Sequence, residues 1–298
     1  MCYLKIAALD IGGTNIKYCL YDTEKPFSAE LLRSVPTHAQ RGAEYVIDHA
    51  IRTLEGLEKF DRIGVSTAGQ VDPVSGMIIF ASDTIRGYTG TQVARIFTEH
   101  FNKPTAVEND VNAAILAEVS FGTKNVEGCI IGLAYGTGIG GAIIQDGKLF
   151  AGSSNAAAEF GHMITHADGV RCICGQNGCY EAYASAAALI RNAERRFGKP
   201  VDGYEIARQR HEPAFKALLE DWYMEVVYGL INLVHIFNPH ELILGGGIME
   251  NDFIMEAITE RLIENILPSY KHVKVKGTRL GNASGLLGAI HLAQAMVI

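Results

Sequence analysis

The first third of the chain alternates short apolar runs with turn residues and with helical stretches. Residues 6–21 form two apolar runs separated by Gly-Gly-Thr, which is typical of a strand, a tight turn and a second strand. Residues 43–60 instead place apolar side chains three or four positions apart, as an amphipathic helix does. The same pattern predicts a strand at 62–66, a hairpin through 77–81, a helix over 91–100 and a strand at 104–107. Strands that alternate with helices indicate an α/β protein.

The pattern of residues 6–21 returns at residues 129–144. In this second copy Gly136-Thr137 aligns with Gly13-Thr14 at an offset of 123 residues. We therefore expect an internally duplicated chain with one glycine hairpin in each half. The remaining pattern predicts a strand at 241–244 and helices over 185–197, 213–226, 228–237, 253–267 and 284–296.

Each glycine hairpin offers backbone N–H groups and a threonine hydroxyl, which are the groups that hold phosphates. A tight turn needs glycine whatever it binds, so a plain turn is the alternative for either hairpin alone. The pairing of two hairpins favours a site for the phosphate chain of a nucleotide. The candidate nucleotide-binding residues in and beside the hairpins are Asp10, Gly12, Gly13, Thr14, Asn15, Lys17, Thr137 and Gly138.

Three further features bear on the nucleotide. Asp10 ends the first strand, and a carboxylate beside phosphates coordinates Mg²⁺ or orients its waters. Lys17 either neutralises phosphate charge or is a solvated lysine on an exposed strand. Gly245, Gly246 and Gly247 follow a predicted strand and open a predicted helix, so a nucleoside can lie close to the backbone there.

Asp110 stands where a predicted strand passes into a helix rich in alanine. Aspartate is common at the N-cap of a helix, which is the structural interpretation of this residue. The functional interpretation is a general base at the mouth of a cleft. Because a helix N-terminus lowers the pKa of an acid, we expect Asp110 to be a weak base.

A short cysteine-rich segment predicts a metal site. Cys172, Cys174 and Cys179 together with His162 supply three thiolates and one imidazole, which suit a tetrahedral Zn²⁺ with no vacancy for water. Such a site is structural. His166 competes with His162 as the fourth ligand, and a disulfide is less expected because cytosolic thiols stay reduced.

Two acids flank this predicted metal site. Glu159 lies three residues before His162, and Glu181 lies two residues after Cys179, so fixing the metal also fixes both carboxylates. Two oriented carboxylates bind vicinal hydroxyls, and the second ring nitrogen of His162 can donate to a ligand hydroxyl. We interpret the segment as a sugar site; the alternative is a zinc knuckle that only holds a loop.

Composition excludes several classes of protein. The chain has 298 residues, 48% hydrophobic and 20% charged, which is ordinary for a soluble protein with two well-filled cores. A net charge of −7 gives no general attraction to nucleic acid. No apolar run approaches the ~18 residues of a membrane span, and residues 1–9 are too short for a signal peptide, so we expect a cytoplasmic protein. Cys2, Cys19 and Cys129 are expected to be core residues.

Five segments resemble, in order, the motifs of the ROK family of bacterial sugar kinases and sugar-responsive repressors. They are Asp10–Thr14, Glu108–Asp110, Gly136–Gly141, Glu159–His162 and Cys172–Glu181. The resemblance implies the actin-like, ribonuclease-H-like ATPase fold, with two α/β lobes around a central cleft, and a homodimer. It places residues 1–111 and the C-terminal helix 287–298 in a small lobe, and residues 112–286 in a large lobe.

The resemblance also implies roles for individual residues. Asp110 is the catalytic base, and the residues expected on the sugar are Gly69, Asp83, Asn109, Asp110, Glu159, His162 and Glu181. Three positions depart from the family pattern: Ala68 replaces a common proline, Asp83 a common asparagine and Ala158 a common glycine. Ionised Asp83 only accepts hydrogen bonds, whereas an amide also donates, so we expect it to recognise a different position of the sugar, unless it faces solvent in a turn.

The resemblance therefore predicts an ATP-dependent sugar kinase with Mg²⁺ and a structural Zn²⁺. The acceptor is the primary hydroxyl, O6, of a hexose such as glucose or of an N-acetylhexosamine such as N-acetylmannosamine. One alternative is a sugar-sensing regulator of the same family; only nine residues precede Asp10, which leaves no room for a helix-turn-helix. The other is an actin-like ATPase that uses no sugar, in which paired acids around a zinc site have no purpose.

Overall fold

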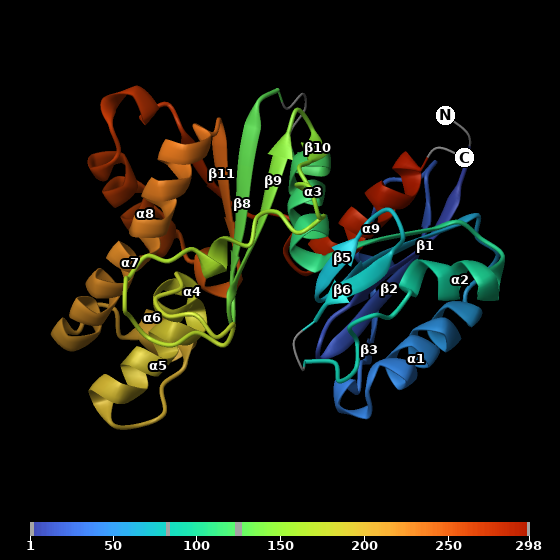
Figure 1. Ribbon diagram of the computed structural model, residues 1–298, viewed down its shortest axis with the longest axis horizontal. Helices are drawn as coiled ribbons and strands as arrows, with labels where there is room; N and C mark the ends of the chain where they lie inside the picture. The colour runs from blue at the N-terminus through green and yellow to red at the C-terminus, as the bar shows by residue number, and fades with distance from the viewer. Residues whose placement is uncertain (1–2, 82–83, 123–126, 297–298) are drawn as a thin grey trace. The chain divides into compact units, whose positions relative to one another are not determined.

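The computed structural model describes residues 3–81, 84–122 and 127–296, which form two compact units (Figure 1). Unit 1 comprises Met1–Val126, Ala151–Ala157 and Arg279–Ile298; unit 2 comprises Glu127–Phe150 and Ala158–Thr278. These limits differ from the expected divisions after residues 111 and 286. Helix α3 (Asp110–Gly122) packs against helix α9 (Ser284–Ala295), and this contact keeps both helices whole within unit 1.

Unit 1 contains a mixed sheet of five strands in the order β3-β2-β1-β4-β7. The strands are β1 (Lys5–Ile11), β2 (Asn15–Asp22), β3 (Arg33–Pro36), β4 (Arg62–Thr67) and β7 (Thr105–Asn109). β1, β4 and β7 are parallel to one another, whereas β2 is antiparallel to both β1 and β3. The carboxyl ends of β1, β3, β4 and β7 therefore lie at one edge of the sheet.

Helices cover both faces of this sheet (Figure 1). Alternate residues of β1 point to opposite sides: Leu9 and Ile11 join the core under α1 (Ala43–Glu55) and α2 (Val93–Phe101), while Ile6 and Ala8 pack with α9. A two-stranded hairpin, β5 (Gln70–Asp72) and β6 (Met77–Phe80), completes the strands described in this unit. The predicted hairpin and strands of this half are confirmed, and β3 is an additional strand that the pattern did not predict.

Unit 2 repeats the arrangement of unit 1, with a sheet in the order β10-β9-β8-β11-β12. The strands are β8 (Cys129–Tyr135), β9 (Ile139–Gln145), β10 (Lys148–Leu149), β11 (Glu241–Gly245) and β12 (Lys274–Gly277). An antiparallel hairpin of β8 and β9 again stands beside two parallel strands. This shared topology is what an internally duplicated chain predicts.

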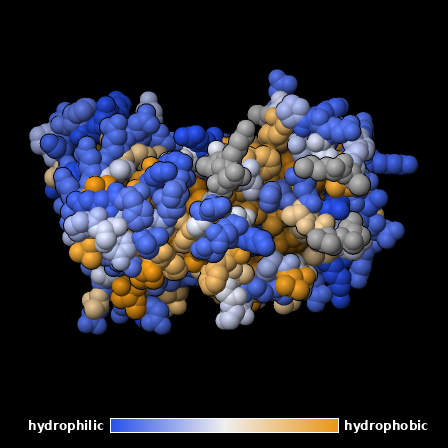
Figure 2. Space-filling view, turned by 90° about the horizontal axis from the view of Figure 1, so that it is seen from above, coloured by the Kyte–Doolittle hydropathy of each residue, from blue (hydrophilic) through white to orange (hydrophobic). Residues whose placement is uncertain are grey.

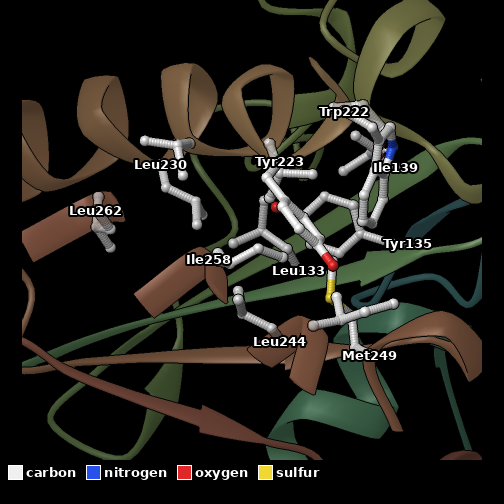
Figure 3. Close-up of a cluster of buried hydrophobic side chains, with 14 of the residues drawn as sticks. Leu133, Tyr135, Ile139, Trp222, Tyr223, Leu230, Leu244, Met249, Ile258 and Leu262 are labelled. Atoms are coloured by element: carbon white, nitrogen blue, oxygen red, sulfur yellow. Dashed lines mark hydrogen bonds between the residues drawn. The ribbon is translucent and has the colours of Figure 1, made fainter. Parts of the chain in front are cut away.

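Two helices of unit 2 enclose the apolar cluster shown in Figure 3, α7 (Pro213–Phe237) and α8 (Asp252–Asn265). Leu133 and Leu244 rise from the sheet to meet Trp222 and Leu230 of α7 (Figure 3). The pattern predicted two helices, 213–226 and 228–237, where the structure has one. This prediction was wrong because Val227 is fully buried and continues the apolar face without a break.

The remaining elements are short. The helices are α4 (Glu181–Ala184), α5 (Ala186–Phe197) and α6 (Gly203–Arg208), and the 3₁₀ turns are η1 (Ala29–Leu31), η2 (Ala39–Arg41), η3 (Phe160–His162), η4 (Gly247–Glu250), η5 (Pro268–Tyr270) and η6 (Gly281–Ala283). The face shown in Figure 2 is mainly hydrophilic, with apolar groups in separate patches. Among the described residues no helix is both long and apolar enough to cross a membrane.

The contact between α3 and α9 gives a stability prediction. A Cβ atom on Gly288 would lie 2.0 Å from the carbonyl oxygen of Ala113, which is backbone and cannot move aside easily. We expect Gly288→Ala to lower the free energy of unfolding by about 1–3 kcal/mol through overpacking, despite the better helix propensity of alanine. Chemical denaturation measures this change. Gly122→Ala, where nothing lies within 4 Å of the added Cβ, is the matched control and should not destabilise; equal losses in both variants would contradict the prediction.

Candidate functional site

Asp10 lies at the carboxyl edge of the unit 1 sheet and is held by two neighbours. The Ser66 hydroxyl donates to Asp10 Oδ1 at 2.8 Å, and the Lys17 ammonium lies 3.4 Å from Asp10 Oδ2. Lys17 stands directly opposite Asp10 in the β1–β2 ladder and also donates to the Asn282 carbonyl at 3.1 Å. Lys17 therefore pairs with Asp10 and is not a fully solvated lysine, and its predicted role in neutralising phosphate charge stays a prediction.

The first glycine turn is fixed through its backbone and leaves its side chains exposed. Gly12 N–H donates to the Asn15 carbonyl at 3.0 Å. From the end of β3, Thr37 donates through its N–H to the Thr14 carbonyl at 2.9 Å and through its hydroxyl to the Gly12 carbonyl at 2.6 Å. Thr14 and Asn15 are exposed, so their outer faces are open to a ligand.

The helix cap beside Asp110 is formed by its neighbour. Asn109 Oδ1 accepts from the backbone N–H groups of Val111 at 2.9 Å and Asn112 at 3.1 Å, which is the pattern of an N-cap side chain. Asn109 Nδ2 donates to the Gly69 carbonyl at 2.9 Å and to Asp110 Oδ1 at 3.0 Å. Asn109 thus links two other predicted sugar-binding residues, Gly69 and Asp110, and Asn109, not Asp110, is the N-cap residue. Asp83 lies outside the described residues.

The pKa of Asp110 is raised to about 6 from its usual value near 4. Burial of the carboxyl is the larger cause and the negative charge of Asp10 the next; hydrogen bonds from Val111 N–H and the Asn109 amide act in the opposite direction. The expectation that the helix N-terminus lowers this pKa was wrong, because desolvation and like charge outweigh the helix end. A carboxyl with this pKa can take up and release a proton near neutral pH.

The predicted metal ligands come together in unit 2. One ligand atom from each of His162, Cys172, Cys174 and Cys179 lies within 4.8 Å of all the others. The Nδ1 atom of His162 is 3.8 Å from Cys172 Sγ, and the sulfurs of Cys174 and Cys179 are 3.5 Å apart. Three thiols and one imidazole at this spacing fit a tetrahedral structural Zn²⁺.

The alternative ligand His166 lies elsewhere. Its Nε2 atom is 3.6 Å from Glu225 Oε1, and its ring stacks on Tyr183 with centroids 4.0 Å apart. His166 is not a member of the metal-ligand cluster. The structure therefore selects His162 as the fourth ligand.

The two predicted sugar acids stand on different sides of the His162 ring. Glu181 Oε1 accepts from Cys172 Sγ at 3.1 Å and lies 3.7 Å from His162 Nδ1, and its other oxygen accepts from Ile139 N–H at 3.3 Å. Glu159 Oε2 lies 4.0 Å from His162 Nε2. Because Nδ1 faces the thiols, Nε2 remains available to a ligand beside Glu159.

Tyr180 positions this segment and was missed by the sequence reasoning. Its hydroxyl donates to the Val226 carbonyl at 2.7 Å and lies 2.9 Å from the Tyr135 hydroxyl, and both tyrosines are fully buried. The Tyr180 ring fills the space above Gly229, where an added Cβ would come within 2.2 Å of the ring. The sequence offers one indication of this role: Tyr180 stands directly between a predicted metal ligand and a predicted sugar-binding acid.

The other glycine turns of unit 2 lie beside this cluster. A Cβ on Gly138 would be 2.4 Å from Glu181 Oε2, so the second hairpin contacts the acid directly, while Thr137 is exposed. Gly245 ends β11 opposite Ala134 of β8, which places Gly246 and Gly247 near the hairpin. The helix predicted to open at this turn begins later, at Asp252, after the 3₁₀ turn η4.

Comparisons with known proteins agree over almost the whole chain. The family model of the ROK family matches residues 6–296. A protein of Vibrio cholerae named N-acetylmannosamine kinase is 30% identical over 96% of this chain and 98% of that protein.

Solved structures show the same likeness. A ROK hexokinase from Thermus thermophilus is 32% identical with a TM-score of 0.82, over 97% of this chain and 98% of that chain. A ROK family glucokinase from Streptomyces griseus, solved in complex with glucose and AMPPNP, is 28% identical with a TM-score of 0.82, over 98% of this chain and 100% of that chain. The expected fold class, an α/β protein of the actin-like ATPase fold, is confirmed.

The four-ligand cluster gives a direct prediction. We expect wild-type protein to carry about one Zn²⁺ per chain, because four N and S ligands complete one tetrahedral site. Cys174→Ser should lose most of this zinc, measured by mass spectrometry of metals after gel filtration. Cys129→Ser, a thiol outside the cluster, is the control and should keep it. Equal zinc in all three proteins would refute the assignment of Cys174.

Proposed function

The chain belongs to the ROK family, and on this premise we propose that it is an ATP-dependent kinase for a hexose or an N-acetylhexosamine. The expected enzyme class, a phosphotransferase with an alcohol group as acceptor, is that of the related glucokinase and N-acetylmannosamine kinase. The observation that most supports the proposal is Asp110, a carboxyl with a pKa of about 6 held by Asn109.

We assign Asp110 as the general base for the primary hydroxyl, O6. The hydroxyl oxygen bonds to the γ-phosphorus, the bond from that phosphorus to the bridging oxygen of ADP breaks, and the hydroxyl proton moves to Asp110. With a pKa of about 6, Asp110 is mostly ionised at neutral pH and is still basic enough to hold the proton. Asn109 orients the carboxylate through its 3.0 Å hydrogen bond.

We assign the sugar hydroxyls to the residues predicted to bind them. Glu159 and Glu181 would accept hydrogen bonds from hydroxyls, and Nε2 of His162 would donate, with its direction fixed by a metal on Nδ1. Asn109 and Gly69 are assigned to the sugar as well, and the Asn109 amide donates to the Gly69 carbonyl at 2.9 Å. Asp83 is proposed as a further acceptor and as a source of sugar preference.

We assign the phosphates of ATP to the glycine turns. In unit 1 the assigned residues are Gly12, Gly13, Thr14, Asn15 and Lys17, of which Thr14 and Asn15 are exposed. In unit 2 they are Thr137, Gly138 and Gly245–Gly247, of which Thr137 and Gly247 are exposed and Gly245 is buried. Mg²⁺, when bound, offsets phosphate charge. Asp10 would hold Mg²⁺ through the ion's waters, since its two oxygens already accept from Ser66 and Lys17. Zn²⁺ has a structural role in this proposal.

We further propose that the protein acts as a cytoplasmic homodimer without a nucleic-acid partner. The resemblance to the family supports the dimer, and the formal charge of −7 argues against general binding to nucleic acid. Size-exclusion chromatography with light scattering tests the dimer, and specific DNA binding would favour the regulator instead.

ADP release tests the enzyme and its acceptor together. We expect sugar-dependent release with at least one of glucose, N-acetylmannosamine, N-acetylglucosamine and mannose, and NMR of the product should locate the phosphate on O6. Asp110→Asn should lower kcat by ~10²–10⁴, the usual effect of removing a positioned base. Glu58→Gln, an exposed acid outside the site, is the control. ADP release that ignores added sugar would favour a non-sugar ATPase, and a fall of less than tenfold in Asp110→Asn would remove Asp110 from the base role.

The raised pKa of Asp110 predicts the pH dependence of both activity and stability. The ionised base is active, so kcat/KM should rise with pH and level off above about 6. In the folded state this pKa lies above its unfolded value, so the stability linked to Asp110 is full below pH ~4 and is lost as pH rises through about 6. Asp110→Asn should therefore be more stable than wild type above pH 6, by of order 1–3 kcal/mol. Identical pH–stability curves for the two proteins would show that the pKa is not raised.

A further inference from the structure

In the proposed function the carboxyl edge of the unit 1 sheet receives phosphate, and Lys17 is one cation at that edge. Lys17 is held by the Asp10 carboxylate and the Asn282 carbonyl, so its charge is already balanced. A nucleotide or a phosphorylated product carries several negative charges to this edge in the proposed reaction. The other cations of the edge are therefore the groups to consider.

The end of β3 brings such cations to the first glycine turn. β3 is parallel to β1, so both strands end at the same edge of the sheet. Thr37, which follows β3, is fully buried and binds the backbone of Gly12 and Thr14 at 2.6 and 2.9 Å. His38 follows directly, and then the 3₁₀ turn that ends at Arg41. The hydrogen bonds of Thr37 thereby anchor the segment from Thr37 to Arg41 to the first glycine turn.

Arg41 is held in place by an aromatic stack. Its guanidinium carbon lies 3.5 Å from the centre of the Tyr45 ring, and Tyr45 stacks on His49 with centroids 5.7 Å apart and planes at 20°. His38 lies 6.0 Å from the Tyr45 ring centre. Stacking uses the face of a guanidinium and leaves the N–H donors on its edge free for a planar or tetrahedral oxyanion.

The charge of Arg41 is not balanced by an acid. Across residues 3–81, 84–122 and 127–296, Arg41 makes no salt bridge, whereas Lys17 does. Arg86, which also makes none within those ranges, accepts the N–H of Ala43 on its backbone carbonyl at 2.9 Å, at the start of α1. The His49 Nε2 atom in the same stack is buried without a hydrogen-bond partner among the described residues.

We propose that Arg41, seated on Tyr45, binds a phosphate group of the ligand at the carboxyl edge of the unit 1 sheet. The ligand class is a phosphate ester or anhydride, either the terminal phosphates of the donor or the phosphate of the sugar product. A guanidinium binds phosphate through two parallel N–H bonds, and a lysine replaces that geometry only in part. The inference rests on the proposed function only in naming these two sources.

Tripolyphosphate is the probe, because its binding needs neither sugar nor turnover. Calorimetric titration at low salt should show at least tenfold weaker binding to Arg41→Gln than to wild type, and an intermediate loss for Arg41→Lys. Arg52→Gln is the matched control: Arg52 lies in the last turn of α1, and its guanidinium carbon is 6.0 Å from the Tyr45 ring centre, against 3.5 Å for Arg41. Its affinity should stay within twofold of wild type. Arg41 is exposed, so thermal melting should show all variants folded.

Equal tripolyphosphate affinity in Arg41→Gln and wild type would overturn the proposal, and so would an equal loss in Arg52→Gln. A raised KM for ATP in Arg41→Gln identifies the donor as the source of the phosphate. Weaker inhibition by the phosphorylated sugar, with an unchanged KM for ATP, identifies the product. Wild-type protein that releases no ADP with any sugar, yet binds tripolyphosphate through Arg41, would refute the kinase and leave this inference standing.

Discussion

The register between parallel strands is the constraint on which the unit 1 site depends. Asp10 of β1 is paired with Ser66 of β4, and Thr67 of β4 is paired with Asn109 of β7. These pairings set the 2.8 Å hydrogen bond from Ser66 to Asp10 and bring Asn109 to the same edge. A shift of one residue would send each of these side chains to the opposite face of the sheet. The close packing of α9 on α3 leaves little freedom for such a shift.

The two aspartates at this edge differ in the charged groups that surround them. Asp10 has a cation in direct contact and a hydroxyl donor, whereas Asp110 has only hydrogen bonds and the nearby charge of Asp10. Burial therefore raises the pKa of Asp110 although it stands at a helix N-terminus. The two neighbouring aspartates thus differ in their surroundings: Asp10 is paired with Lys17, whereas Asp110 pairs with no cation of this kind among the described residues.

The sequence predicted what is local and missed what is assembled over long range. Both glycine hairpins and the cluster of Cys172, Cys174 and Cys179 with His162 lie within short segments, where spacing alone determines which side chains can meet. The packing of α9 on α3, which are far apart in the chain, was not predicted. The pKa of Asp110 depends on burial, which motif spacing does not report. Asp83, Glu159 and the other sugar residues remain predictions about binding.

Two separate sets of contacts hold Glu181 in position. One involves the predicted metal ligands and the other involves the neighbouring Tyr180. Two of the predicted metal ligands contact the Glu181 carboxylate, through Cys172 Sγ and His162 Nδ1. Oxidation of the thiols or removal of metal would therefore change the contacts of the carboxylate. Tyr180 instead ties the adjacent backbone to the core of unit 2 through Val226 and Tyr135. That core is apolar and buried, and its contacts with Tyr180 involve none of the predicted metal ligands. The zinc site would then mainly set the direction of the His162 ring and of the side chains around it. The core would set the backbone position of Glu181.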